Sequence, residues 1–98
     1  MRVMNMISPR SGREVANQFI ISYGRKIAFQ SYNSKIVDID KEEKTITVYR
    51  DWDYSTTTGK YRNQFMEDEG FDEMATKKGF EHYMNLGKIG DYTIIKEF

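Results

Sequence analysis

The chain has 98 residues, no cysteine, and fifteen acidic residues against fifteen basic ones. We expect a single domain over residues 1–98, because this length supports one modest core and excludes two. Without cysteine the chain cannot form a disulfide framework or a zinc–thiolate site. Its net charge of zero also argues against a DNA mimic that depends on charge alone.

The charges are unevenly distributed along the chain. Residues 1–35 hold six basic residues and one acidic residue, a net charge of +5, so residues 36–98 carry −5. The densest acidic patch comprises Glu67, Asp68, Glu69, Asp72 and Glu73. This polarity predicts either two solvated faces, or a basic face for nucleic acid and an acidic face for a basic groove.

The first half of the chain predicts an antiparallel meander. Residues 1–16 show no steady periodicity and predict a loop, with a helical turn near Arg13–Ala16. Strands are predicted at Phe19–Ile21, Ile27–Ser31, Ile36–Ile39 and Thr45–Arg50. The connections between them are short and contain turn residues, which favours antiparallel pairing of neighbours.

A short helix is predicted after the fourth of these strands. Ser55 and the three threonines that follow it are typical N-cap residues. Tyr61 and Phe65 lie four residues apart, as on one helical face. These features predict a helix over residues 57–66, although Gly59 lowers its intrinsic stability.

A second helix and a closing strand are predicted in the last third of the chain. The helix starts near Phe71, and its apolar residues fall on two opposite faces, which favours an interruption or a kink at Gly79. Gly87 and Gly90 are predicted to end it, and Tyr92–Ile95 is predicted as a strand. The whole pattern predicts an α+β fold, an antiparallel sheet of about four strands with one or two helices packed on one face.

The run from Tyr49 to Phe65 combines the only tryptophan of the chain with tyrosines, threonines and charged residues. Trp, Tyr and Arg carry most of the binding energy at protein interfaces, so this run indicates recognition more than catalysis. We predict a docking surface for a partner protein that comprises Arg50, Trp52, Tyr54, Tyr61, Arg62, Glu67, Asp68 and Glu69.

The sequence gives little support for catalysis or for metal binding. His82 is the only histidine, and neither a cysteine nor a Gly-x-Ser-x-Gly motif accompanies it. The segment Thr57–Lys60 lacks both the first glycine and the final hydroxyl residue of a phosphate-binding loop. Two pairs of aspartates spaced two apart are not followed by a calcium-loop pattern. We therefore expect no enzymatic activity, no metal and no cofactor.

Three blocks of the chain resemble a family of small, uncharacterised accessory proteins encoded by phages and prophages of Gram-positive bacteria. The blocks are Ser8–Ile21, Phe29–Ser34, and the pair Asp51–Ser55 with Thr57–Phe65. The C-terminal third matches this family only in outline. The resemblance implies a phage accessory protein that acts in the host cytoplasm. Small phage proteins of this size often block host defences, and some are anti-CRISPR proteins that bind an effector nuclease.

The leading hypothesis is therefore a non-enzymatic, phage-encoded inhibitor of a host defence system, specifically an anti-CRISPR protein. It would bind a host CRISPR effector nuclease, or another defence protein, and exclude target DNA. One alternative is a nucleic-acid-binding accessory protein that uses Arg10, Arg13, Arg25 and Lys26. Another is a sponge for a nucleotide signal, with aromatic rings stacked on a base and arginines on phosphate.

We expect the protein to be cytoplasmic and without a membrane partner. No apolar run in the sequence is long enough for a signal peptide or a membrane span.

Overall fold

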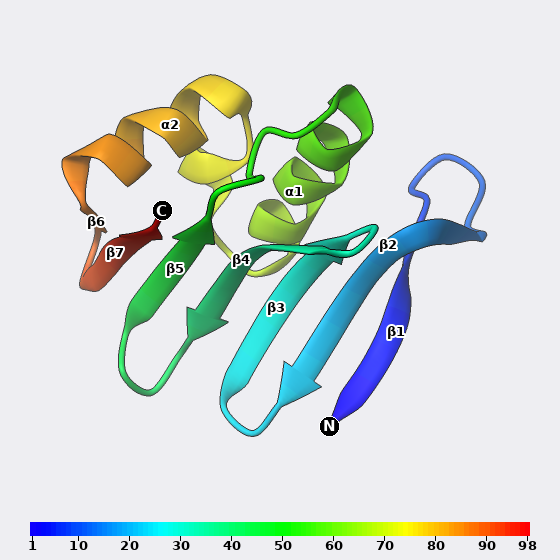
Figure 1. The fold of residues 1–98 in the computed structure, drawn as a ribbon, viewed down its shortest axis with the longest axis horizontal. Helices are drawn as coiled ribbons and strands as arrows, with labels where there is room; N and C mark the ends of the chain where they lie inside the picture. The colour runs from blue at the N-terminus through cyan, green and yellow to red at the C-terminus, as the bar shows by residue number, and fades with distance from the viewer.

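The computed structural model describes residues 1–98 and contains one seven-stranded sheet and two α-helices (Figure 1). The strands are β1 (Arg2–Ile7), β2 (Glu14–Tyr23), β3 (Lys26–Ser31), β4 (Ser34–Asp40), β5 (Thr45–Tyr49), β6 (Lys88–Ile89) and β7 (Tyr92–Glu97). The helices are α1 (Thr56–Asp68) and α2 (Lys77–Leu86), joined through a 3₁₀ turn, η1 (Asp72–Met74). The strand order is β1-β2-β3-β4-β5-β7-β6, and β5 and β7 are the parallel pair in an otherwise antiparallel sheet.

The predicted four-stranded antiparallel sheet is wrong, because the sheet is larger and mixed. Arg2–Ile7, predicted as loop, forms the edge strand β1. The helical turn predicted near Arg13–Ala16 is instead the start of β2. The final strand was predicted, but it runs parallel to β5, since the helices carry the chain back across the sheet before β7 begins. The α+β class itself is retained.

One face of the sheet carries the core. Residues directly opposite in register share a face, and one row across four strands consists of Ile27, Ile39, Ile46 and Ile94. On the same face, Phe29 stacks on Phe65 of α1 with ring centroids 5.9 Å apart. Phe80 and Met84 of α2 belong to the same buried cluster. Both helices therefore pack on this face, as predicted, and the opposite face has no helix against it.

Side-chain caps set the two helix starts. α1 begins after Ser55, whose hydroxyl accepts a hydrogen bond from the amide of Thr58 at 3.1 Å, and this confirms the predicted first helix. α2 begins after Thr76, whose hydroxyl accepts from the amide of Gly79 at 3.0 Å. The predicted interruption at Gly79 is therefore wrong, because the break between the helical segments lies just before Thr76. Gly87, at φ +84°, ends α2 in the left-handed conformation. Neither helix has the length and apolar content that crossing a membrane requires.

Candidate functional site

The structure divides the predicted docking residues between buried and exposed positions. Tyr61 and Arg62 are buried, with 6% and 0% relative exposure, and Trp52 is half-buried. Arg50 and Tyr54 are exposed, the side chain of Arg50 to 84% and Tyr54 to 69%. Tyr61 and Arg62 therefore offer no surface to a partner, while Arg50 and Tyr54 do.

The acidic part of the predicted surface lies at the far end of α1. Glu67 and Asp68 are exposed, whereas Glu69 is mostly buried and pairs with Lys41 at 2.9 Å. Burial, and then the neighbouring Glu69, raises the pKa of Asp68. α1 has 13 residues and so is about 20 Å long. The acidic residues and Tyr54 consequently do not form one continuous surface.

Strand β2 separates the basic residues of the nucleic-acid alternative. Arg10 and Arg13 lie in the loop before β2, and Arg25 and Lys26 follow it (Figure 1). Ten residues of strand span about 30 Å. Arg25 also forms ion pairs with three acidic side chains, Asp40, Glu42 and Glu43. The structure does not bring the four predicted residues together in one basic patch.

Arg62 is the centre of a cluster that joins the loop after β5 to both helices. Its Nη1 donates a hydrogen bond to the carbonyl oxygen of Trp52 at 2.7 Å. Its guanidinium lies over the rings of Trp52 and Phe80, 5.3 and 4.9 Å from their centroids. These two rings stack on each other at 5.4 Å. Burial lowers the pKa of Arg62, and the nearby Asp53 acts in the opposite direction. In the run from Tyr49 to Phe65, Trp52 and Arg62 therefore contribute mainly to internal packing and not to a docking surface.

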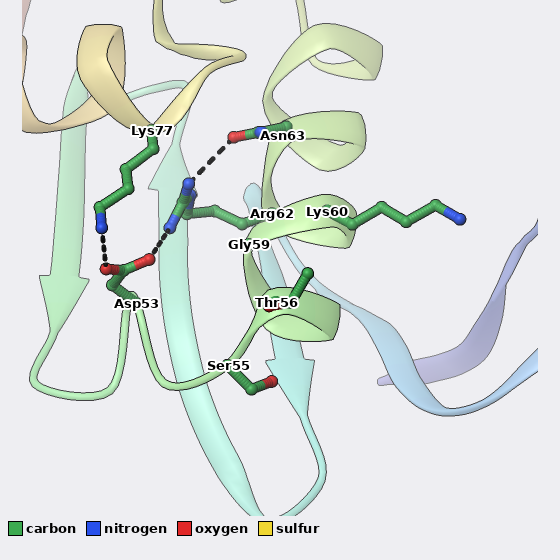
Figure 2. A pocket seen from close by; sticks show the side chains of 8 residues that line it. All are labelled: Asp53, Ser55, Thr56, Gly59, Lys60, Arg62, Asn63 and Lys77. Atoms are coloured by element: carbon green, nitrogen blue, oxygen red, sulfur yellow. Dashed lines mark hydrogen bonds and ion pairs between the residues drawn. The ribbon is translucent and has the colours of Figure 1, made fainter.

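A polar pocket of about 510 Å³ opens beside this cluster (Figure 2). None of its eight lining residues is hydrophobic: Asp53, Ser55, Thr56, Gly59, Lys60, Arg62, Asn63 and Lys77. Figure 2 shows Asp53 between two cations, with Lys77 Nζ at 2.9 Å and Arg62 Nη1 at 3.5 Å from its carboxylate oxygens. Lys60 points away from this ion-pair cluster. The lining includes three cations and one anion, so the pocket is positively charged.

Gly59 lies directly over the buried guanidinium. A Cβ at this position would be 3.7 Å from Arg62 Nη2 and 3.9 Å from Nη1, so the glycine backbone lies close to that group. Arg62 Nε has no hydrogen-bond partner within the protein. The first turn of α1 contains no acidic residue, and the nearby carboxylate of Asp53 comes from the loop before the helix.

Sequence reasoning missed most of this pocket. The segment Thr57–Lys60, which fails the phosphate-loop motif, forms the first turns of α1. One face of α1 lines the pocket with Thr56, Lys60 and Asn63. These residues are three or four positions apart in the sequence, and this spacing could have predicted that they share a helical face. Lys77 carries no such signal, because it comes from a different helix.

A family model, and no individual protein, identifies the family of the chain. Searches of curated proteins and of solved structures find no match. A family model matches residues 1–82, a range that contains the three resemblance blocks and every residue that lines the pocket. The expectation of an uncharacterised family is confirmed, and the chain belongs to the family of unknown function DUF8033.

Proposed function

We propose that the chain is a non-enzymatic, phage-encoded inhibitor of a host defence system, which sequesters a nucleotide signal in the host cytoplasm. The observation that supports this function is the pocket beside α1, which is lined by the exposed Lys60 and Lys77, by the buried Arg62 beneath them, by one carboxylate and by no apolar side chain. Arginine and lysine are the side chains that match phosphate oxygens. Such a lining offers little to an apolar ligand.

The carboxylate in the pocket is already neutralised within the protein. Asp53 pairs with both Lys77 and Arg62. Lys60 is exposed and forms no ion pair within the chain; its ammonium group lies 5.3 Å from the centre of the Tyr61 ring, so the side chain turns toward the pocket when a phosphate binds. An incoming phosphate group would therefore meet the net charge of the other lining cations, which favours binding.

The start of α1 adds to this attraction. The first amides of a helix have no partner within the helix, and its N-terminus carries a partial positive charge. Thr56, the first residue of α1, lines the pocket directly after the cap residue Ser55. Helix N-termini of this kind are common phosphate sites, and here the cationic lining supplies the charge that a helix end alone lacks.

Tyr54 supplies the feature that suits a nucleotide better than free phosphate. It is 69% exposed and stands in the chain between Asp53 and Ser55, which both line the pocket. Stacking of a base on an aromatic ring is worth about 1–3 kcal/mol. A ligand that stacks a base on Tyr54 and places a phosphate group in the pocket is a nucleotide.

Isothermal titration calorimetry with cyclic nucleotides and with inorganic phosphate tests this function. We expect Lys60→Ala to weaken both kinds of ligand at least about tenfold, since a charge-assisted contact is worth about 1.5–3 kcal/mol. Tyr54→Ala should weaken the nucleotides and leave inorganic phosphate unchanged. Lys78→Ala is the matched control, because this exposed lysine does not line the pocket.

The proposal fails if the wild-type protein binds none of the cyclic nucleotides. It also fails if Lys60→Ala and Lys78→Ala bind with the same affinity as each other.

A second candidate is an anti-CRISPR protein that binds a host effector nuclease and excludes target DNA. It is supported by Arg50 and Tyr54, which stand exposed on the segment between β5 and α1. In a DNA-cleavage assay with CRISPR effector nucleases, the wild-type protein should inhibit and the Arg50→Ala/Tyr54→Ala double variant should not. Undiminished cleavage in the presence of the wild-type protein would remove this candidate.

A further inference from the structure

Strand β1 is an edge of the sheet with little protection against further pairing. It pairs only with β2, so the backbone groups on its outer side have no strand partner. Arg2 is the single charged residue among its six. Three of its apolar side chains are exposed: Val3 to 53%, Met4 to 41% and Ile7 to 47%. Proteins usually protect such edges with charges, prolines or very short strands, and β1 has one charge at its start.

A groove of about 490 Å³ follows this edge. It is lined by all of Val3–Ile7, together with Glu14, Ile20, Gln64 and Asp68. Successive side chains of a strand point to opposite faces, so a groove that touches five consecutive residues must include the free edge. α1 forms its other wall, where Gln64 Nε2 donates to the carbonyl oxygen of Ile7 at 2.8 Å. The groove therefore fits an extended segment laid along β1.

The charge of the groove restricts what this segment can be. Its two charged lining residues, Glu14 and Asp68, are acidic, and neither forms an ion pair within the chain. Burial and Glu69 disfavour the ionised form of Asp68 and raise its pKa, so a nearby cation would relieve this cost. The groove thus calls for a strand with apolar side chains and a positive charge.

We propose that the occupant is β1 of a second copy of this chain, paired antiparallel with β1 so that two sheets join into one. β1 has the required composition, since Val3, Met4 and Ile7 are exposed and Arg2 is exposed and unpaired at its start. With the two-fold axis at Met4, the helices of both copies lie on the same side, Met4 pairs with Met4 of the second copy, and Arg2 pairs with Met6. Arg2 shares a face with Met4 and Met6, so it lies on the helix side of the joined sheet, where Asp68 of the second copy lines the groove.

This interface is independent of the pocket beside α1 and of its ligand. It is a β-augmentation, in which main-chain hydrogen bonds provide affinity and alternate side chains provide specificity. The isologous arrangement repeats the Arg2–Asp68 attraction at both ends of the paired strands.

Size-exclusion chromatography with light scattering on the full chain measures the predicted dimer. The wild-type protein should show twice the mass of one chain, and Met4→Asp should reduce it to one. Ile95→Asp is the matched control, because Ile95 is equally exposed at 41% but lies on β7, far from β1 in the strand order of the sheet. It should remain dimeric. Circular dichroism confirms that each variant is folded.

A charge exchange provides the second test. Arg2→Glu should dissociate the dimer, and the double variant Arg2→Glu/Asp68→Arg should restore it. A monomeric wild-type protein, or a dimer that survives both Met4→Asp and Arg2→Glu, would overturn the proposal. Dissociation by Ile95→Asp alone would also overturn it, because the interface would then lie on the uncovered face of the sheet.

Discussion

Alanine at the two helical glycines, Gly59 and Gly79, should change the stability of the protein in opposite directions. Neither residue has a positive φ, so backbone strain does not distinguish them. A Cβ at Gly59 would meet Arg62 Nη2 at 3.7 Å, which is ordinary contact. A Cβ at Gly79 would overlap with the backbone oxygen of Glu73 and would lie 3.0 Å from Thr76 Oγ1.

These contacts set the expected magnitudes. Gly59→Ala should raise the free energy of unfolding by about 1 kcal/mol, the difference in helix propensity, and so raise Tm by about 4–8 °C. Gly79→Ala gains the same propensity but must displace the backbone between η1 and α2. Overpacking costs about 1–3 kcal/mol, and loss of the Thr76 cap costs about 1 kcal/mol more. We therefore expect a net loss of about 1–3 kcal/mol for Gly79→Ala.

Urea denaturation followed by far-UV circular dichroism measures both effects. The midpoints should move in opposite directions while the slopes stay equal, since neither change alters the surface exposed on unfolding. A destabilised Gly59→Ala protein would refute the contact geometry at Arg62. A Gly79→Ala protein as stable as the wild type would refute the close approach to Glu73.

Three further variants test buried polar groups. Gln18 is fully buried and its side-chain amide has no hydrogen-bond partner within the protein, so Gln18→Met should raise Tm. The same substitution at Gln30, which is hydrogen-bonded and partly exposed, is the control. If Gln18→Met does not raise Tm, a bound water satisfies the amide. Arg62→Ala removes a buried guanidinium and leaves the Trp52 carbonyl unpaired. Urea denaturation should therefore show that the free energy of unfolding falls by about 3–5 kcal/mol. A fall of less than about 1 kcal/mol would contradict the stabilising role of the cluster around Arg62. Backbone hydrogen bonds, led by that from Glu43, hold the pKa of Asp40 below its usual 3.8. The resulting stabilisation is present above that value and is lost as the pH falls through the lowered pKa, so Tm measured against pH should fall less steeply in acid for Asp40→Asn.

Local patterns in the sequence were sufficient for the middle of the molecule. β3, β4 and β5 combine alternating apolar residues with short turns, and these signals come from neighbouring residues. The start of α1 was equally readable, because Ser55 and Thr58 form the cap within four residues.

The sheet edge was not readable from such patterns. β1 mixes methionine with asparagine, and its register with β2 shifts between Asn5 and Ile7. Asn17 in β2 adopts φ +64°, which interrupts the alternation that would have marked this strand. Pairing with a neighbour, and not intrinsic preference, makes Arg2–Ile7 a strand.

The sequence alone determined an α+β chain without cysteine, with a central meander and a capped helix after it. The tertiary structure determined which side chains in the run from Tyr49 to Phe65 are buried and which are exposed. Whether Arg62 faces a partner or the interior depends on Trp52 and Phe80, which come from different segments and stack where the two helices meet. Whether a charged side chain is buried depends on groups that are distant in sequence. The local pattern of apolar and polar residues does not show that such groups come together in the fold.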